Sequence, residues 1–157
     1  MRTFASPAEL IAAVGETIGP GPWHPIEQSR VDAFAGATGD HQWIHTDPQR
    51  AAAGPFGGTI AHGYLTLSLI PWLMRDLYTV AGARMGVNYG LNKVRFPAPL
   101  RTGRSVRASA TIAEATPVSG GGVQLVVTVV ISSDGGEKPV CVAETVSRVY
   151  FPEEPTA

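Results

Sequence analysis

The second half of the chain contains four segments in which apolar and polar residues largely alternate, residues 87–96, 106–112, 123–131 and 140–150. Glycine-rich connections follow the second and third of them. In the third segment every second residue from Val123 to Ile131 is apolar. Because successive side chains of a strand point to opposite faces, this pattern predicts antiparallel strands in a sheet with one buried face.

Residues 60–80 form the most apolar helix candidate in the chain. Apolar residues occur nearly all round this predicted helix, so we expect it to be buried. Pro71 removes one backbone hydrogen bond and predicts a kink, while Arg75 and Asp76 argue against a membrane span. A helical first half followed by strands predicts an α+β domain whose sheet wraps round this long central helix.

Three shorter helices carry recognisable start or stop signals. Ser6 before a proline predicts a helix start, and Asp47 before Pro48 predicts another. Ser29, followed three residues later by an aspartate, resembles a capping box for a helix that ends near Gly39.

Length, charge and cysteine content restrict the class of protein. The 157 residues predict a single domain over residues 1–157, in which residues 152–157 form a flexible tail. Twelve basic and thirteen acidic residues indicate no preference for nucleic acid or an anionic membrane. The single cysteine, Cys141, is expected to pack in the core. Without a signal-peptide pattern or a spanning segment, the expected location is the cytoplasm.

Asp40 and His45 are the first candidates for chemistry, because they lie five residues apart in a predicted loop. A carboxylate beside an imidazole can hold one water between them, with the histidine as general base and the aspartate as its partner or proton donor. The alternative is that Asp40 caps a helical turn and His45 is a structural histidine, and spacing alone leaves both open.

His62 and Gly63 begin the predicted central helix. The first turn of a helix presents unpaired N–H groups, which stabilise a carbonyl oxygen that becomes negative. Gly63 could let a substrate approach the backbone, or it could only permit close packing. His62 could be a second base or a structural residue.

Other site types find less support in the sequence. His41, His45 and His62 lie near two aspartates but lack the spacing of zinc sites, so no metal is predicted. The glycine-rich loop 54–58 lacks the features of a phosphate-binding loop, and Ser68 has no partner that would make it a nucleophile. The densest basic group is Lys93, Arg95, Arg101, Arg104 and Arg107. These residues could bind an anionic ligand such as a nucleotide phosphate or form a solvated face.

Taken together, these residues resemble the MaoC-like dehydratase family, the (R)-specific enoyl-CoA hydratases with a hot-dog fold. The matching parts are residues 34–40, His45, residues 47–48 and 51–53, residues 60–63, the apolar helix, and residues 94–103. The resemblance implies a sheet wrapped round a central helix over residues 62–80. It also implies a homodimer with the acyl site at the interface. No cofactor is expected.

The resemblance also implies roles for single residues. In the family, the positions matching Asp40 and His45 bind and activate the water that adds to a trans-2-enoyl thioester, and the N–H matching Gly63 polarises the thioester carbonyl. The expected substrate-binding residues are Gln42, His62, Ser68 and Arg95. Gln42 and Trp43 depart from the asparagine and proline usual in the family, which affects the expected substrate range more than the reaction.

The expected activity is reversible hydration of a trans-2-enoyl-CoA or acyl carrier protein thioester. His45 would take the water proton, Asp40 would orient the water and help return a proton to C2, and the Gly63 N–H would stabilise the enolate oxygen. Two alternatives share the fold, a hot-dog thioesterase and a non-catalytic acyl-thioester-binding subunit. The position of the Asp40–His45 pair before the helix favours hydration.

Overall fold

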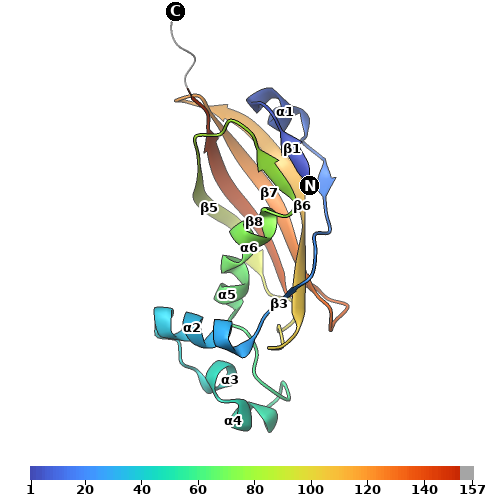
Figure 1. Ribbon diagram of the computed structural model, residues 1–157, viewed down its shortest axis with the longest axis vertical. Helices are drawn as coiled ribbons and strands as arrows, with labels where there is room; N and C mark the ends of the chain where they lie inside the picture. Colours follow the sequence, from blue (N-terminus) through green and yellow to red (C-terminus); the bar gives the residue numbers. More distant parts are fainter. Residues whose placement is uncertain (153–157) are drawn as a thin grey trace, which may run out of the picture.

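The four predicted strands are present and form the main sheet of a computed structural model that describes residues 1–152 (Figure 1). They are β5 (Met85–Arg95), β6 (Ser105–Val118), β7 (Gly122–Ser133) and β8 (Cys141–Tyr150). Two short strands, β2 (Thr17–Ile18) and β3 (His24–Pro25), pair with β6. The order is β2-β6-β7-β8-β5, and every pairing in this sheet is antiparallel. Apart from Pro152, the predicted tail lies outside the described residues.

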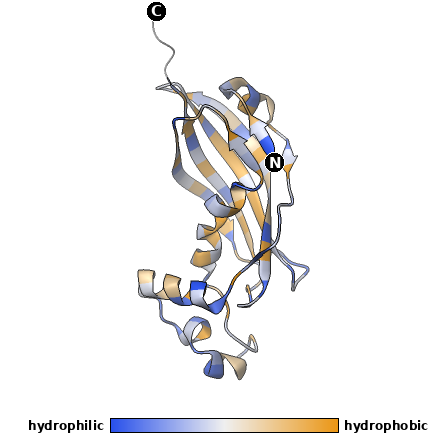
Figure 2. Cartoon of the chain, in the orientation of Figure 1, coloured by the Kyte–Doolittle hydropathy of each residue, from blue (hydrophilic) through white to orange (hydrophobic). Residues whose placement is uncertain are grey.

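The buried face of the sheet is the one that the alternation predicts. Val123, Leu125, Val127, Val129 and Ile131 of β7 are all buried in the main core. Cys141 is also fully buried, as expected of a structural cysteine, and burial raises the pKa of its thiol to about 11. Figure 2 shows the corresponding apolar bands running across the strands.

The predicted central helix over residues 60–80 is wrong in its length and in its expected burial. It consists of two short helices, α5 (Gly63–Ser68) and α6 (Ile70–Met74), that lie against the sheet and contact β8 and β6 respectively (Figure 1). Pro71 has no N–H to continue the hydrogen bonds of α5, which accounts for the interruption at Leu69. Residues 78–80 instead form β4 (Tyr78–Val80), which pairs in parallel with β1 (Arg2–Phe4).

One side of these two helices is also exposed, in contrast to the predicted burial all round. Tyr64 is 72% exposed, and Ser68, Pro71 and Arg75 continue the same stripe at helical spacing. The sheet covers only the opposite side, where Leu65, among others, is buried. The exposed stripe faces a groove bordered by β5.

Three of the four remaining helices gather at one end of the sheet (Figure 1). They are α2 (Gln28–Thr38), α3 (Trp43–Thr46) and α4 (Pro48–Ala52), beside the start of α5, whereas α1 (Pro7–Ala12) lies at the opposite end. Ser6 and Asp47 cap α1 and α4 as predicted. The predicted cap at Ser29 is wrong, because α2 already begins at Gln28 after the extended Glu27. Among the described helices, none has the length and apolar character that a bilayer crossing requires.

Candidate active site

Asp40 lies directly after the end of α2. Gly39 ends this helix with a φ of 77°, a left-handed conformation that glycine adopts without strain. The Asp40 side chain is exposed, and its Oδ1 accepts a hydrogen bond from the Gln42 N–H at 3.4 Å. The turn after α2 therefore delivers a carboxylate to the surface beside α3.

His45 lies in α3 and is only 6% exposed. Its Nδ1 is 2.7 Å from the Ile60 carbonyl oxygen. Because a carbonyl can only accept, Nδ1 must carry the hydrogen, and the neutral ring then presents a lone pair at Nε2. This fixed tautomer makes Nε2 of His45 a suitable proton acceptor.

His62 lies behind this pair and holds both residues in place. Its Nε2 donates to the backbone oxygen of Asp40 at 2.9 Å, and its ring stacks on the His45 ring with centroids 3.8 Å apart. The His62 side chain is 2% exposed, and its Nδ1 has no hydrogen-bond partner among the described residues. These contacts favour a supporting role, and the predicted contact of His62 with substrate stays a prediction.

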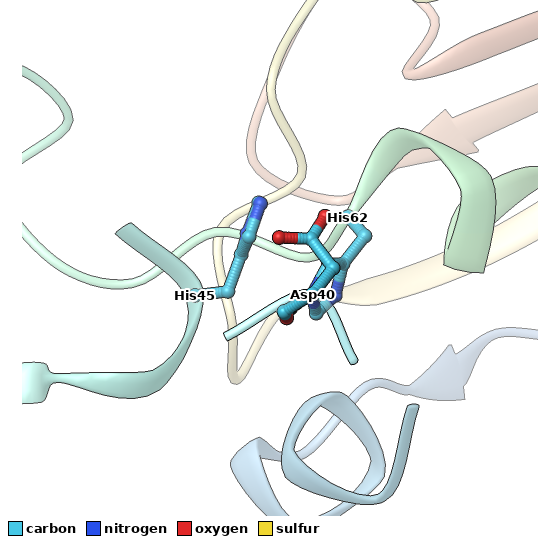
Figure 3. Close-up of side chains that lie close together, drawn as sticks. All are labelled: Asp40, His45 and His62. Carbon is cyan, nitrogen blue, oxygen red and sulfur yellow. The ribbon is translucent and has the colours of Figure 1, made fainter. Parts of the chain in front are cut away.

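Figure 3 shows Asp40, His45 and His62 converging from three separate segments of the chain. One side-chain donor atom from each lies within 4.8 Å of the other two. Such a spacing can hold a water between the carboxylate and an imidazole. By geometry alone it could also hold a metal ion, although Nδ1 of His45 and Nε2 of His62 are already bonded to carbonyls. Removal of divalent cations from the protein tests the prediction that the site works without metal.

The surroundings of His45 favour its neutral form. Burial lowers the pKa of His45 below its ordinary value of 6.5, and the hydrogen bond to Ile60 opposes this shift. The nearby His62 lowers the pKa further, whereas the Asp40 charge raises it. Because burial is the largest of these effects, His45 is neutral near pH 7 and can accept a proton.

Gly63 is the first residue of α5, and its N–H has no hydrogen-bond partner among the described residues. Its Cα lies against the ring of Phe96, so that an added Cβ would be 3.0 Å from two ring carbons. The close-packing role considered for Gly63 is thus present. It is compatible with an N–H that binds substrate, because glycine leaves the backbone accessible.

The other predicted substrate-binding residues lie at different places around the site. Gln42 precedes α3, where its side chain is exposed and its carbonyl accepts the His45 N–H at 2.9 Å. Ser68 Oγ donates to the Tyr64 carbonyl at 2.7 Å, on the exposed stripe of α5. Arg95 lies at the end of β5 and donates to the Val94 carbonyl at 2.7 Å. The hydrogen bonds of Ser68 and Arg95 go to these neighbouring carbonyls and not to Asp40, His45 or His62.

Gln28, which the sequence did not single out, supports the backbone around His45. Its Nε2 donates to the His45 carbonyl at 2.7 Å, and its Oε1 accepts from Thr59 Oγ1 at 2.6 Å. The adjacent Ile60 in turn bonds to His45 Nδ1 and to the backbone of α3. Gln28 therefore ties the segment that carries the base to the segment that fixes its tautomer. Its early position in α2 gave no local signal of these distant partners.

Comparisons with known proteins agree with this geometry. A model of the MaoC-like domain matches residues 9–134 of the chain. The 3-hydroxyacyl-thioester dehydratase Z of Mycobacterium tuberculosis is 53% identical over 148 residues, which cover 94% of this chain and 98% of that protein. Nodulation protein N of Rhizobium leguminosarum bv. viciae is 38% identical over 148 residues, which cover 92% and 91%.

A solved structure extends the likeness to the fold. The (R)-hydratase PhaJ1 of Pseudomonas aeruginosa superposes with a TM-score of 0.68 at 24% identity, covering 98% of this chain and 96% of that one. The predicted hot-dog fold, an antiparallel sheet packed on central helices, is thereby confirmed.

Proposed function

The chain belongs to the MaoC-like dehydratase family, and we propose that it is an (R)-specific enoyl-thioester hydratase, equally a 3-hydroxyacyl-thioester dehydratase. The observation that carries the proposal is the buried, neutral His45, whose Nδ1 is held by the Ile60 carbonyl and which has a ring nitrogen within 4.8 Å of an Asp40 carboxylate oxygen. The likeness in sequence to a 3-hydroxyacyl-thioester dehydratase over almost the whole chain supports the same reaction.

In the hydration direction, His45 Nε2 accepts a proton from a water held beside Asp40, and the water oxygen bonds to C3 of the enoyl group. The electron pair of the C2–C3 double bond moves toward the thioester, whose oxygen becomes negative. The Gly63 N–H stabilises this oxygen, and the proton that His45 took from the water is returned to C2 with the help of Asp40, which leaves both side chains as they began. Dehydration of the 3-hydroxyacyl thioester uses the same groups in reverse.

The active form in this proposal is a homodimer. Strand β5 lies at the edge of the sheet, and Met85, Val87, Tyr89 and Leu91 leave large apolar side chains exposed on it. An exposed apolar edge strand is a favourable pairing surface for a second copy. A second copy would also cover the groove of about 410 Å³ between β5 and the stripe of α5 and α6 that contains Ser68. The molar mass in solution, measured by light scattering, tests this part.

The proposed setting is a single domain in the cytoplasm that acts in fatty acid metabolism on a CoA or acyl carrier protein thioester. These proposals rest on the sequence features described above and on the similarity to a 3-hydroxyacyl-thioester dehydratase. No cofactor is needed for the steps described, since water is the only other reactant.

The deciding experiment follows the ultraviolet absorbance of crotonyl-CoA and of a longer trans-2-enoyl-CoA with purified protein. We expect loss of the conjugated absorbance without release of free thiol, and no such loss with Asp40→Asn. Thiol release would instead identify a thioesterase. No change with any CoA or carrier-protein thioester would identify a binding subunit.

A further inference from the structure

Phe96 lies directly against the start of α5. An added Cβ on Gly63 would be 3.0 Å from two carbons of the Phe96 ring and 3.3 Å from a third. The ring also meets the next residue of the helix, Tyr64, edge to face, with ring centroids 6.4 Å apart and an interplanar angle of 85°. One aromatic side chain thus contacts the first two residues of α5, and the first of these carries the N–H that has no partner in the described part of the chain.

The backbone that carries Phe96 has little freedom to move. The residue directly follows β5, whose last two residues, Val94 and Arg95, pair with β8. Pro97 comes next, and a proline restricts the residue before it to extended conformations. The ring is therefore held from the side of the sheet, and Gly63 rests against a fixed surface.

The segment that leads to Gly63 is positioned by other contacts. Residues 59–61 pair with the segment around Arg101 through two backbone hydrogen bonds of 2.8 and 3.0 Å. The Arg101 side chain also donates to the carbonyls of residues 56 and 57 at 2.6 and 2.7 Å, which fixes the loop before this segment. None of these bonds reaches Gly63, where the Phe96 ring provides the packing contact.

The surroundings of Phe96 differ from those of a core residue. Its side chain is 40% exposed, and within residues 1–152 it is neither part of the main hydrophobic core nor packed against it. An aromatic side chain contributes most to stability when it is fully buried. Loss of the ring should therefore affect the position of Gly63 more than the free energy of unfolding.

The position of the Gly63 N–H determines how well it can stabilise a negative oxygen. Such a donor acts best about 2.7–3.1 Å from the oxygen on which the charge develops. A displacement of about 1 Å can lower the rate about 100-fold. Because glycine has no side chain of its own to anchor it, a neighbouring group must set its position.

We infer that Phe96 is a positioning residue for the reaction, whose ring sets the place of the Gly63 N–H that stabilises the thioester oxygen. This inference rests on the proposed function, because the Gly63 N–H is the oxyanion donor of that mechanism. Phe96 acts through Gly63 and takes no part in proton transfer.

The first test measures crotonyl-CoA hydration by Phe96→Ala, which removes the ring, and by Phe96→Tyr, which keeps it. Phe96→Ala should lower kcat about 10- to 100-fold and change KM less than about threefold. Phe96→Tyr should keep kcat within about twofold of the wild-type value. The matched control is Trp23→Ala, at an aromatic residue that is 42% exposed and stacks with Arg107. It should also keep kcat within about twofold.

The infrared carbonyl band of bound crotonyl-CoA provides a readout that a purely structural role would not move. In a His45→Gln background the base is absent, so the thioester stays intact while the band is recorded. A hydrogen bond from the Gly63 N–H lowers the frequency of this band. Adding Phe96→Ala should reverse most of that shift, and adding Phe96→Tyr should keep it.

Gly63→Ala tests the same contact without removing the ring. Its Cβ would press on Phe96, so kcat should fall in the wild-type background. In the Phe96→Ala background the same change should cost about tenfold less, because the ring is gone. Equal losses in the two backgrounds would overturn the inference. If Phe96→Ala did not fold, an unchanged kcat and carbonyl band in Gly63→Ala would overturn it.

Failure of the inference and failure of the proposed function give different results. Hydration with an unchanged kcat and carbonyl band in Phe96→Ala would overturn the inference and leave the proposed reaction standing. No turnover by the wild-type protein, together with a carbonyl band that depends on Phe96, would contradict the proposed reaction. That result would keep the role of Phe96 in positioning Gly63.

Discussion

The buried sheet and the end formed by α2, α3 and α4 are held together in different ways. In the sheet, backbone pairing in long regular strands places apolar side chains such as Leu125 and Val129 in one core. At the other end the helices are short, and side chains hold distant backbone carbonyls, as Gln28, His45 and His62 do. We therefore expect changes in the sheet to affect stability first, and changes at the helical end to affect catalysis first.

The largest expected effect is that of His45→Gln, which removes the base and keeps a side chain able to donate to the Ile60 carbonyl. We predict a fall in kcat/KM of about 100- to 10,000-fold for crotonyl-CoA hydration, because the proton transfer is lost. Thermal unfolding should change little. His41→Gln, at an exposed histidine of the same segment, is the control and should keep full activity. Equal losses in the two variants would contradict the assignment of His45.

The matching change in the sheet is Leu125→Ala, at a residue 1% exposed in β7. Loss of buried methyl groups and the cavity left behind should lower the free energy of unfolding by about 2–5 kcal/mol. The protein that remains folded should keep its kcat, which activity measured well below the unfolding temperature would show. Gln124→Ala, on the other face, should cost about 1 kcal/mol. A large drop in kcat for folded Leu125→Ala would contradict the expectation that changes in the sheet affect stability before catalysis.

A smaller effect is expected for Gln28→Ala, at a residue that links α2 to α3 and to Thr59 within the helical end. The variant leaves the His45 carbonyl and the buried Thr59 hydroxyl without their partner. The free energy of unfolding should fall by about 1–3 kcal/mol. Because the base becomes less well positioned, kcat should fall about tenfold while KM changes less.

The control for Gln28 is Asp32→Ala, which removes only the exposed partner of the same amide. Its kcat should stay within about twofold of the wild-type value, since exposed polar pairs contribute little. If Gln28→Ala lowered stability and left kcat intact, Gln28 would have a structural role alone.

The pH dependence of activity should follow the lowered pKa of His45. His45 acts as a base in its neutral form. We therefore expect kcat/KM to be constant above pH 6.5 and to fall only as the pH drops through the pKa that His45 has in the folded protein. Burial disfavours the charged ring, so stability should likewise be full above pH 6.5 and decline as the pH falls below it. An acid limb centred above pH 6.5 would show that another group is titrating.

The smallest expected effect is that of metal removal. Dialysis against a chelator should leave crotonyl-CoA hydration within about twofold of the untreated protein, because the mechanism needs no Lewis acid. Elemental analysis of the purified protein is the companion measurement. A loss of activity that a divalent cation restores would identify the cluster of Asp40, His45 and His62 as a metal site.

The two regions also differ in how far their sequences predict them. The period of two in residues 123–131 is a local property, and it correctly identified strand β7 and its buried face. The helix end at Gly39 and the helix cap at Asp47 were predicted from equally local signals, and both are confirmed. The break at Leu69 was visible only in part, because a proline can either kink a helix or interrupt it, and the surrounding packing decides which.

The contacts that build the site have no such local signal. Asp40 and His45 could be chosen by residue type, yet the bonds from Gln28 to His45 and Thr59 join residues 17 and 31 positions apart. No periodicity reports on contacts at these separations. The same holds for Arg101, whose role in the loop at residues 56–57 emerges only once the chain is folded.

Most of the contacts that position the site end on main-chain oxygens, those of Asp40, His45, Phe56, Gly57 and Ile60. A carbonyl is present whatever side chain the residue carries. The side chains of Phe56 and Ile60 can therefore change in evolution or by design without loss of these bonds. Such a framework would let descendants of one gene vary these side chains while retaining the same acid–base pair.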